Sequence, residues 1–345
     1  MEIDLVKQPL DLHFHPSSNV VAAGLINGKL FLYATESQQP QSIITGSEDR
    51  SILATDVETG TAIARLKNSH RAPISRVVNL TESTIASGDD EGCIKVWDAR
   101  HRSCCSFFNV HEDVISDMTF ASDSMKLIGT SGDGTLSVCN LRSNRVQTQS
   151  EFAEDELLSV VIMKNGRKVI CGTQTGALLL YSWGFFKDYS DRFVGLAGNP
   201  VNALLKVSTF HEYHSFYEIC HAFPSKLIEL VPVILICFLS HYCLKLDEER
   251  IITGCENGLS LVGILPNRII QPFAMHSKNY HVERLAYSHD RKFLGSISHD
   301  ENLKLWDLDE LLQATGNTAQ NPSAASHSES DGMEVDNSTP KPSRI

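Results

Sequence analysis

Short apolar runs separated by polar turns dominate the chain. The runs at residues 74–80, 84–87 and 93–97 each have the length of a strand, and the polar residues 89–92 predict a tight turn between the last two. Gly92 ends this turn, where a two-residue hairpin requires a positive φ. The pattern therefore predicts antiparallel hairpins and an all-β fold.

The same unit recurs along the chain and defines a period. Its anchor is the turn residue five positions before a Trp or its substitute, and successive anchors lie mostly about 42 residues apart. The anchors are Gly28, Arg50, Gly92, Gly134, Gly176, Gly258 and Glu301. This period is typical of four-stranded propeller blades, and seven anchors predict a seven-bladed β-propeller.

These units resemble WD40 repeats, and the resemblance covers residues 9–312. In that family a His before the first strand, a Ser or Thr on the second and an Asp in the turn form a hydrogen-bond chain to the Trp. The resemblance implies such a structural chain in two units, with Glu91 at the usual Asp position of the first. The candidate members are His70, Ser87 and Trp97 in the third unit, and His276, Ser296, Asp300 and Trp306 in the last.

The period also predicts the domain organisation. A propeller over residues 1–312 is followed by a Ser-rich and acidic tail at 313–345, whose composition predicts disorder. The blades are expected at approximately 9–36, 42–66, 67–108, 109–151, 152–192, 193–271 and 272–312.

One interval is too long for the period. Gly176 and Gly258 lie 82 positions apart, and removal of residues 207–245 restores the pattern of the other units. We therefore place an insertion in the hairpin between the first and second strands of blade six. Two origins remain open: translated intron sequence or a gene-model error, and a lineage-specific interaction loop. The spacing of its Cys and His residues fits no closed zinc pattern; these residues are His211, His214, Cys220, His221, His241 and Cys243.

Another interval is too short. Gly28 and Arg50 lie 22 positions apart, which leaves only residues 34–41 between two predicted strands. Eight residues cannot form two further strands and their turns. Blade one is therefore expected to lack its outermost strand, and blade two its innermost. A blade that is incomplete in this way would expose sheet edges.

Composition narrows the class of partner. The formal net charge of −12 disfavours free nucleic acid or an anionic membrane as the partner, because both require a positive surface. The longest apolar run, 227–239, is too short for a membrane helix and contains Glu229 and Pro232. The N-terminus shows no secretory leader, and nine Cys without a C-x-x-C pair favour a reducing compartment with structural thiols.

The motifs of the sequence do not indicate a catalytic site. The glycines around Asp133 belong to a blade turn and match no phosphate-binding loop, and the acids at 89–91 lie in a tight turn. We expect no catalytic residue, no resident metal and no cofactor, and therefore a protein that is not an enzyme.

One segment points to a partner. Residues 85–100 closely resemble the box of propellers that dock on the damaged-DNA-binding adaptor of cullin-4 ubiquitin ligases, whose key element is Trp-Asp-x-Arg. The resemblance assigns partner binding to Trp97, Asp98 and Arg100, with Asp98 orienting the guanidinium. Blade four carries a degenerate copy of this motif, which keeps only the arginine, Arg142. A local ion pair at a turn is the alternative interpretation.

Longer runs narrow the resemblance to one subfamily. Residues 120–127, 130–141, 182–188 and 263–268 are similar to the WD repeat-containing protein 55 family, particularly its plant members. The resemblance implies a scaffold that acts in ribosomal RNA processing with pre-ribosomal factors. Its expected location is the nucleus and nucleolus, with the cytoplasm as a further location. In plants the resemblance also implies cullin-4 ligase assembly and a role in development. The short tail lacks the Lys-rich end of the family, which leaves nuclear import open.

Overall fold

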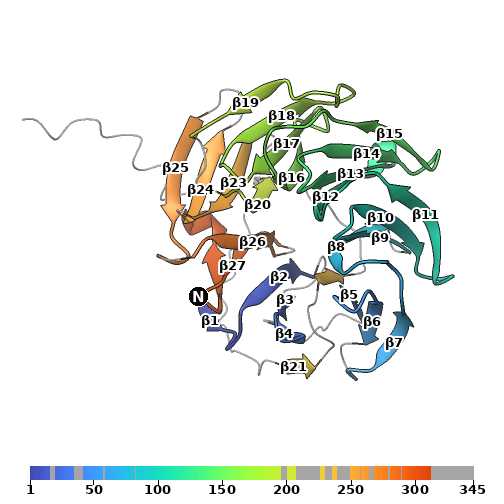
Figure 1. The fold of residues 1–345 in the computed structure, drawn as a ribbon. Coiled ribbons are helices and arrows are strands. Elements are labelled where there is room, and N and C mark those ends of the chain that lie inside the picture. The colour runs from blue at the N-terminus through green and yellow to red at the C-terminus, as the bar shows by residue number, and fades with distance from the viewer. Residues whose placement is uncertain are drawn as a thin grey trace, which may run out of the picture.

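Seven four-stranded antiparallel sheets stand in a ring around a central axis, as Figure 1 shows. The computed structural model describes residues 1–15, 20–34, 42–56, 59–81, 83–195, 200–206, 226–229, 235–238, 249–256, 258–263, 268–278, 280–288 and 290–311. The predicted all-β, seven-bladed propeller is confirmed. The expected tail at 313–345 and the six Cys and His residues named in the insertion lie outside the described residues.

Blades three to five each consist of four strands that are consecutive in the chain. Blade three comprises β8 (Ile74–Thr81), β9 (Thr84–Asp89), β10 (Cys93–Asp98) and β11 (Ser103–Asn109). Blade four comprises β12 (Ile115–Ala121), the 3₁₀ turn η1 (Ser122–Ser124), β13 (Lys126–Ser131), β14 (Leu136–Asn140) and β15 (Arg145–Gln149). Blade five comprises β16 (Leu157–Met163), β17 (Lys168–Thr173), β18 (Leu178–Ser182) and β19 (Asp191–Phe193).

The predicted turn anchors all adopt left-handed backbone geometry. Their φ angles run from 64° at Glu301 to 95° at Gly258, and Arg50 has a φ of 67°. At Gly92 a Cβ would lie 2.3 Å from the carbonyl oxygen of His111, so both the turn and the next segment require glycine there. The hairpin explanation of the period is therefore confirmed.

Blade six carries the insertion where the pattern placed it. Its innermost strand β20 (Ala203–Lys206) pairs with β23 (Arg250–Cys255), and the insertion lies between them. Two further strands, β24 (Gly258–Gly263) and β25 (Arg268–Ala274), complete the sheet.

Strands from the insertion occupy the two edges that the short interval leaves unpaired. Blade one contains β2 (Pro9–Phe14), β3 (Val20–Leu25) and β4 (Lys29–Ala34), and its fourth strand is β21 (Lys226–Glu229), which pairs antiparallel with β4. Blade two contains β5 (Ser42–Gly46), β6 (Ile52–Asp56) and β7 (Ala62–Leu66). Its innermost strand is β22 (Leu235–Phe238), which pairs with β5.

The local sequence of blade two thus lacks an inner strand, as the spacing predicts, but the blade is not left incomplete. Its missing strand comes from nearly 190 residues further along the chain. The physical reason is that an unpaired strand edge offers backbone donors and acceptors to any apolar segment that can reach it.

The two ends of the chain close the ring. Blade seven comprises β26 (Val282–Tyr287), β27 (Phe293–Ser298) and β28 (Asn302–Asp307). Its outermost strand is β1 (Glu2–Asp4), which pairs antiparallel with β28 from Glu2 opposite Lys304. The described chain ends in one helical turn at 308–311. The sequence pattern did not predict β1.

Apolar contacts between neighbouring blades form the core. Between blades four and five, for example, Ile128 and Val138 pack with Val160 and Tyr181. Tyr181 stands where the repeat pattern expects Trp, and it is fully buried. Stability at this blade therefore comes from packing of the sheet faces.

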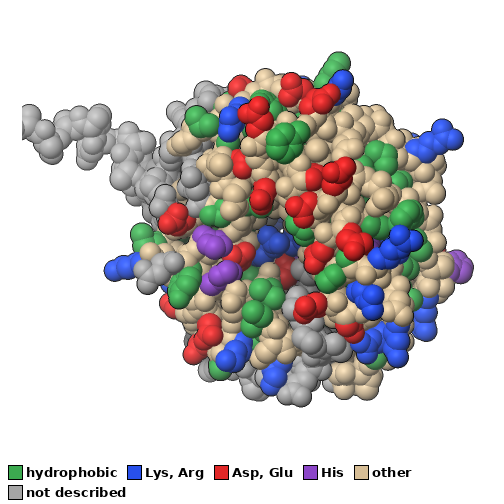
Figure 2. Space-filling view, in the orientation of Figure 1, with side chains coloured by type: hydrophobic (Ala, Val, Ile, Leu, Met, Phe, Trp, Pro, Cys, Tyr) green, Lys and Arg blue, Asp and Glu red, His purple; other side chains and the backbone are tan. Residues whose placement is uncertain are grey.

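Buried charges join the inner strands of several blades at the central channel. Arg76 on β8 lies 2.5 Å from Asp117 on β12 and 3.5 Å from Asp11 on β2. Arg284 on β26 approaches the same Asp11 oxygen at 3.7 Å. Figure 2 shows cationic and anionic side chains in the hollow at the centre of the face. The Arg76–Asp11 pair bridges blades one and three past blade two.

We predict that the insertion stabilises the ring. Replacing residues 207–245 by a Gly/Ser linker of equal length would remove the backbone hydrogen bonds that β4 and β5 make with β21 and β22. Each lost hydrogen bond should lower the free energy of unfolding by about 0.5–1.5 kcal/mol. We expect a melting temperature lower by at least about 5 °C in thermal unfolding. An unchanged or higher melting temperature would show that β21 and β22 contribute nothing to stability.

Candidate partner-binding site

The candidate site lies on the turn that follows β10 in blade three. The Asp98 Oδ1 atom accepts hydrogen bonds from the backbone N–H groups of Arg100 at 2.8 Å and of His101 at 3.0 Å. Its other oxygen pairs with Nδ1 of His101 at 2.9 Å. The hydrogen bonds from His101, and after them the one from Arg100, lower the pKa of Asp98 to about 2. The carboxylate that caps this turn is therefore ionised at neutral pH.

Asp98 therefore orients Arg100 through the backbone. The alternative interpretation supposes a local ion pair between Asp98 and Arg100, but the side chain that contacts the Asp98 carboxylate is the imidazole of His101. Arg100 is exposed, and its guanidinium has no hydrogen bond or ion pair to any described residue. The turn consequently presents a free planar cation.

Blade four repeats this turn more fully than its sequence suggests. Asn140 Oδ1 accepts hydrogen bonds from the backbone N–H groups of Arg142 at 3.0 Å and Ser143 at 3.2 Å. Arg102 and Asn144 end the two turns with φ angles of 52° and 50°. An amide oxygen can cap the turn as a carboxylate does, so the side chain of Arg142 is presented like that of Arg100.

The two turns carry a set of exposed arginines at one end of the ring, which we call the arginine rim. They follow the third strands of adjacent blades, which run in the same direction along the ring axis, so they lie at the same end of the ring. The exposed cations of the rim are Arg100, Arg102, Arg142 and Arg145. Sequence reasoning missed Arg102 and Arg145, which the motif does not include: Arg102 corresponds to Asn144 of the next unit, and Arg145 to Ser103 of the previous one.

Trp97 supports the rim from inside the molecule. It is only 7% exposed and packs among apolar residues of blades two and three. Its indole N–H donates to the Ser87 hydroxyl at 2.8 Å, and Ser87 Oγ lies 2.6 Å from His70 Nε2. Trp97 thus anchors the end of β10 and offers no surface to a partner, unlike the role expected for it.

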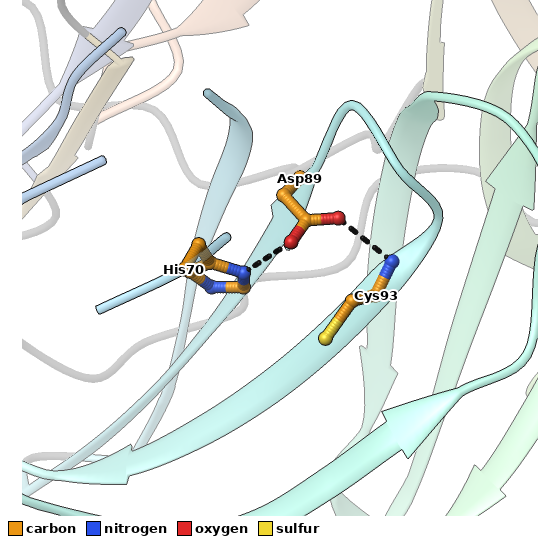
Figure 3. A group of neighbouring side chains, drawn as sticks. All are labelled: His70, Asp89 and Cys93. Carbon is orange, nitrogen blue, oxygen red and sulfur yellow. Dashed lines mark hydrogen bonds and ion pairs between the residues drawn. The ribbon is translucent and has the colours of Figure 1, made fainter. Parts of the chain in front are cut away.

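Asp89, not Glu91, completes this chain. The carboxylate of Asp89 lies 2.7 Å from His70 Nδ1 and accepts a hydrogen bond from the backbone N–H of Cys93 at 2.8 Å (Figure 3). The carboxylate of Asp89 can only accept, so His70 donates to it from Nδ1. The Nε2 atom of a neutral imidazole then accepts from the Ser87 hydroxyl, which itself accepts from the Trp97 indole. Glu91 is exposed, and the expectation that it holds the Asp position is corrected.

Blade seven holds the other expected chain. His276 Nδ1 lies 2.6 Å from Ser296 Oγ, and its Nε2 lies 3.2 Å from Asp300. The Trp306 indole N–H donates to the same Ser296 hydroxyl at 2.8 Å. Burial, opposed by the Asp300 charge, lowers the pKa of His276.

The group in Figure 3 also has the residue types of a metal site, because His70, Asp89 and Cys93 place donor atoms within 4.8 Å of one another. Its chemistry favours the structural role. Both nitrogens of His70 are already hydrogen-bonded, and burial raises the pKa of Cys93 to about 12. A thiol of such pKa is a poor source of the thiolate that metals bind.

The comparisons with known proteins agree with the fold. The family described as WD domain, G-beta repeat matches residues 61–98, 102–140 and 268–307. The chain is 54% identical over 349 aligned positions to WD repeat-containing protein 55 of Arabidopsis thaliana, covering 94% of this chain and 87% of that protein. The chain belongs to the WD repeat-containing protein 55 family.

More distant relatives extend the similarity. The protein of that name from Bos taurus is 30% identical, over 87% of this chain and 74% of its own length. WD repeat-containing protein JIP5 of Cryptococcus neoformans is 28% identical, over 89% and 81%. The resemblance drawn from the sequence runs is thereby confirmed. Among the described residues, no helix has the length and apolar character to cross a membrane.

We predict that Ser87→Ala destabilises the propeller. The substitution removes the shared partner of the Trp97 indole and the His70 imidazole, at about 1–3 kcal/mol for each polar group left unpaired. Denaturant unfolding should show a lower midpoint with an unchanged slope. Ser103→Ala on the exposed strand β11 is the matched control and should stay within about 0.5 kcal/mol. Equal midpoints for both variants would contradict a structural chain.

Proposed function

We propose that this protein is a non-catalytic scaffold that docks through its arginine rim on the damaged-DNA-binding adaptor of a cullin-4 ubiquitin ligase. The observation that carries the proposal is the paired presentation of Arg100 and Arg142. Each follows a side-chain cap on the third strand of its blade, and each is exposed.

Electrostatics supports a protein partner with an acidic surface. The rim concentrates four exposed arginines on a chain whose formal net charge is −12. A local basic surface on an acidic protein selects a complementary acidic surface and repels other acidic proteins. Arginine is also enriched at interface hot spots, because its planar fork binds carboxylates with two hydrogen bonds.

Exposed apolar side chains on the same two blades fit the same function. Phe107 on β11 is 57% exposed, and Val146 on β15 is 39% exposed. Both lie on the outermost strands of the two blades that carry the rim. Exposed aromatic and aliphatic side chains next to arginines are a composition typical of protein interfaces.

The nucleolar function implied by the resemblance remains the second candidate. It would place the protein in the nucleus and nucleolus with pre-ribosomal factors. Family membership favours it, since relatives of this chain occur in animals, as WD repeat-containing protein 55, and in a fungus, as WD repeat-containing protein JIP5. It requires no cation at positions 100 and 142.

We predict that the double substitution Arg100→Ala/Arg142→Ala weakens adaptor binding by about tenfold or more, because each arginine contact is worth at least about 1 kcal/mol. Binding of the full chain to purified adaptor is the measurement. The control Arg71→Ala/Arg192→Ala removes the same charge from two exposed arginines outside the rim and should bind like the unsubstituted protein.

Equal binding by the rim variant and the unsubstituted protein would rule out docking through these arginines. Co-sedimentation with pre-ribosomal particles that is unaffected by the rim substitutions, combined with no adaptor binding, would favour the second candidate. Arg100→Lys keeps the charge without the planar fork and should bind more weakly than the unsubstituted protein if the contact is bidentate.

A further inference from the structure

Two histidines and a glutamate converge at one end of blade seven. His281 Nε2 lies 2.5 Å from Glu283 Oε1, and His299 Nε2 lies 2.8 Å from the same oxygen. The three donor atoms lie within 4.8 Å of one another. Figure 2 shows two His side chains side by side on the face of the ring, over β26 and β27.

The strands hold these residues in place. His281 directly precedes β26, Glu283 lies on it, and His299 directly follows the paired strand β27. The buried Ser298 hydroxyl donates to the carbonyl oxygen of His281 at 2.8 Å. Donor groups built on strand ends are positioned more accurately than groups on loops.

From this geometry we propose that His281, Glu283 and His299 form a binding site for a divalent transition-metal ion of the zinc type. Two imidazoles and one carboxylate are a ligand set that Zn²⁺ takes, at about 2.0–2.2 Å from each donor. A tetrahedral ion at these distances separates its donors by about 3.3–3.5 Å. Small side-chain rotations open the present hydrogen bonds to that spacing.

Access and charge also suit an ion from solvent. The three side chains are about one-fifth to one-third exposed, at 32% for His281, 20% for Glu283 and 35% for His299. This exposure leaves a fourth coordination position open to water. The negative net charge of the chain favours the approach of a cation.

The cluster differs from the other His-containing group in being free to exchange partners. In the described part of the chain, the ring nitrogens of His281 and His299 that face the cluster bond only Glu283. The group of His70 is instead committed to Trp97 through Ser87. The site also lies at the opposite end of the ring from the arginine rim, because it is reached from the start of an inner strand, whereas the rim follows the end of a third strand.

The test is titration of the metal-stripped full chain with Zn²⁺, followed by calorimetry and by thermal unfolding. We expect one Zn²⁺ site in the unsubstituted protein, and we expect Zn²⁺ to raise its melting temperature. In His281→Gln/His299→Gln the affinity of this site should fall by at least about tenfold, and the rise in melting temperature should be lost. The exposed thiols of Cys104 and Cys105 could bind Zn²⁺ in competition with the histidine site. The control is therefore Cys104→Ser/Cys105→Ser, which should retain the site.

Glu283→Gln provides a second variant with little change in shape, and it should weaken the same site. Melting of each variant without metal establishes that it is folded. Identical Zn²⁺ titrations for the unsubstituted protein, the histidine variant and Glu283→Gln would overturn the proposal, as would loss of the site in the cysteine control alone.

Discussion

Ring closure is the constraint on which the rest of this structure depends. A propeller blade has its faces covered by its neighbours and its inner strand against the axis, so one missing strand leaves both a ladder and two apolar faces unsatisfied. The chain meets the constraint by long-range pairing. Strand β1 joins β28 across the whole sequence, and β21 and β22 complete the blades that the short interval leaves with three strands. The buried Asp11, which faces both Arg76 and Arg284, ties blade one to blades three and seven on the channel side.

The proposed docking function depends on closure of the ring, because the arginine rim has no rigidity of its own. The caps supplied by Asp98 and Asn140 fix only the turn backbone. What fixes the two turns relative to each other is the packing of blade three on blade four, where Ile94 and Phe108 meet Ile115 and Leu127. The polar chain through Trp97 then holds the end of the strand from which the first turn leaves. A partner that contacts both arginines at once therefore depends on the buried core between blades three and four, which fixes the distance between the two turns.

The sequence predicted what short-range rules control. A positive φ at each anchor, the strands around it and the position of the insertion all follow from spacing and turn chemistry, even at Arg50, which has no glycine. Pairing between distant segments could not be predicted this way. Nothing local in residues 226–229 or 235–238 specifies β4 or β5 as partner, since a strand edge accepts any segment able to extend along it.

The roles of side chains were predicted less well than the strands. A sequence motif specifies the type of residue at a position, but it does not specify which neighbouring group that side chain contacts. Asp89 takes the place expected for Glu91 because it ends β9 facing His70, while Glu91 turns to solvent. Asn140 was passed over because it lacks the charge of the motif, although an amide oxygen caps the turn equally well. The cluster around Glu283 is invisible in the sequence, since only the pairing of β26 with β27 brings His281 and His299 together.

Hydrogen exchange of the intact protein tests completion of the ring most directly. A strand paired on both sides protects all its amides, whereas an edge strand protects only alternate ones. The account predicts that residues 29–32 of β4 and 43–46 of β5, which pair with β21 and β22, exchange as slowly as the central strands β9 and β10 of blade three. Rapid exchange of alternate amides in β4 and β5 would mean that β21 and β22 do not pair with them, and the ring would then close without these strands.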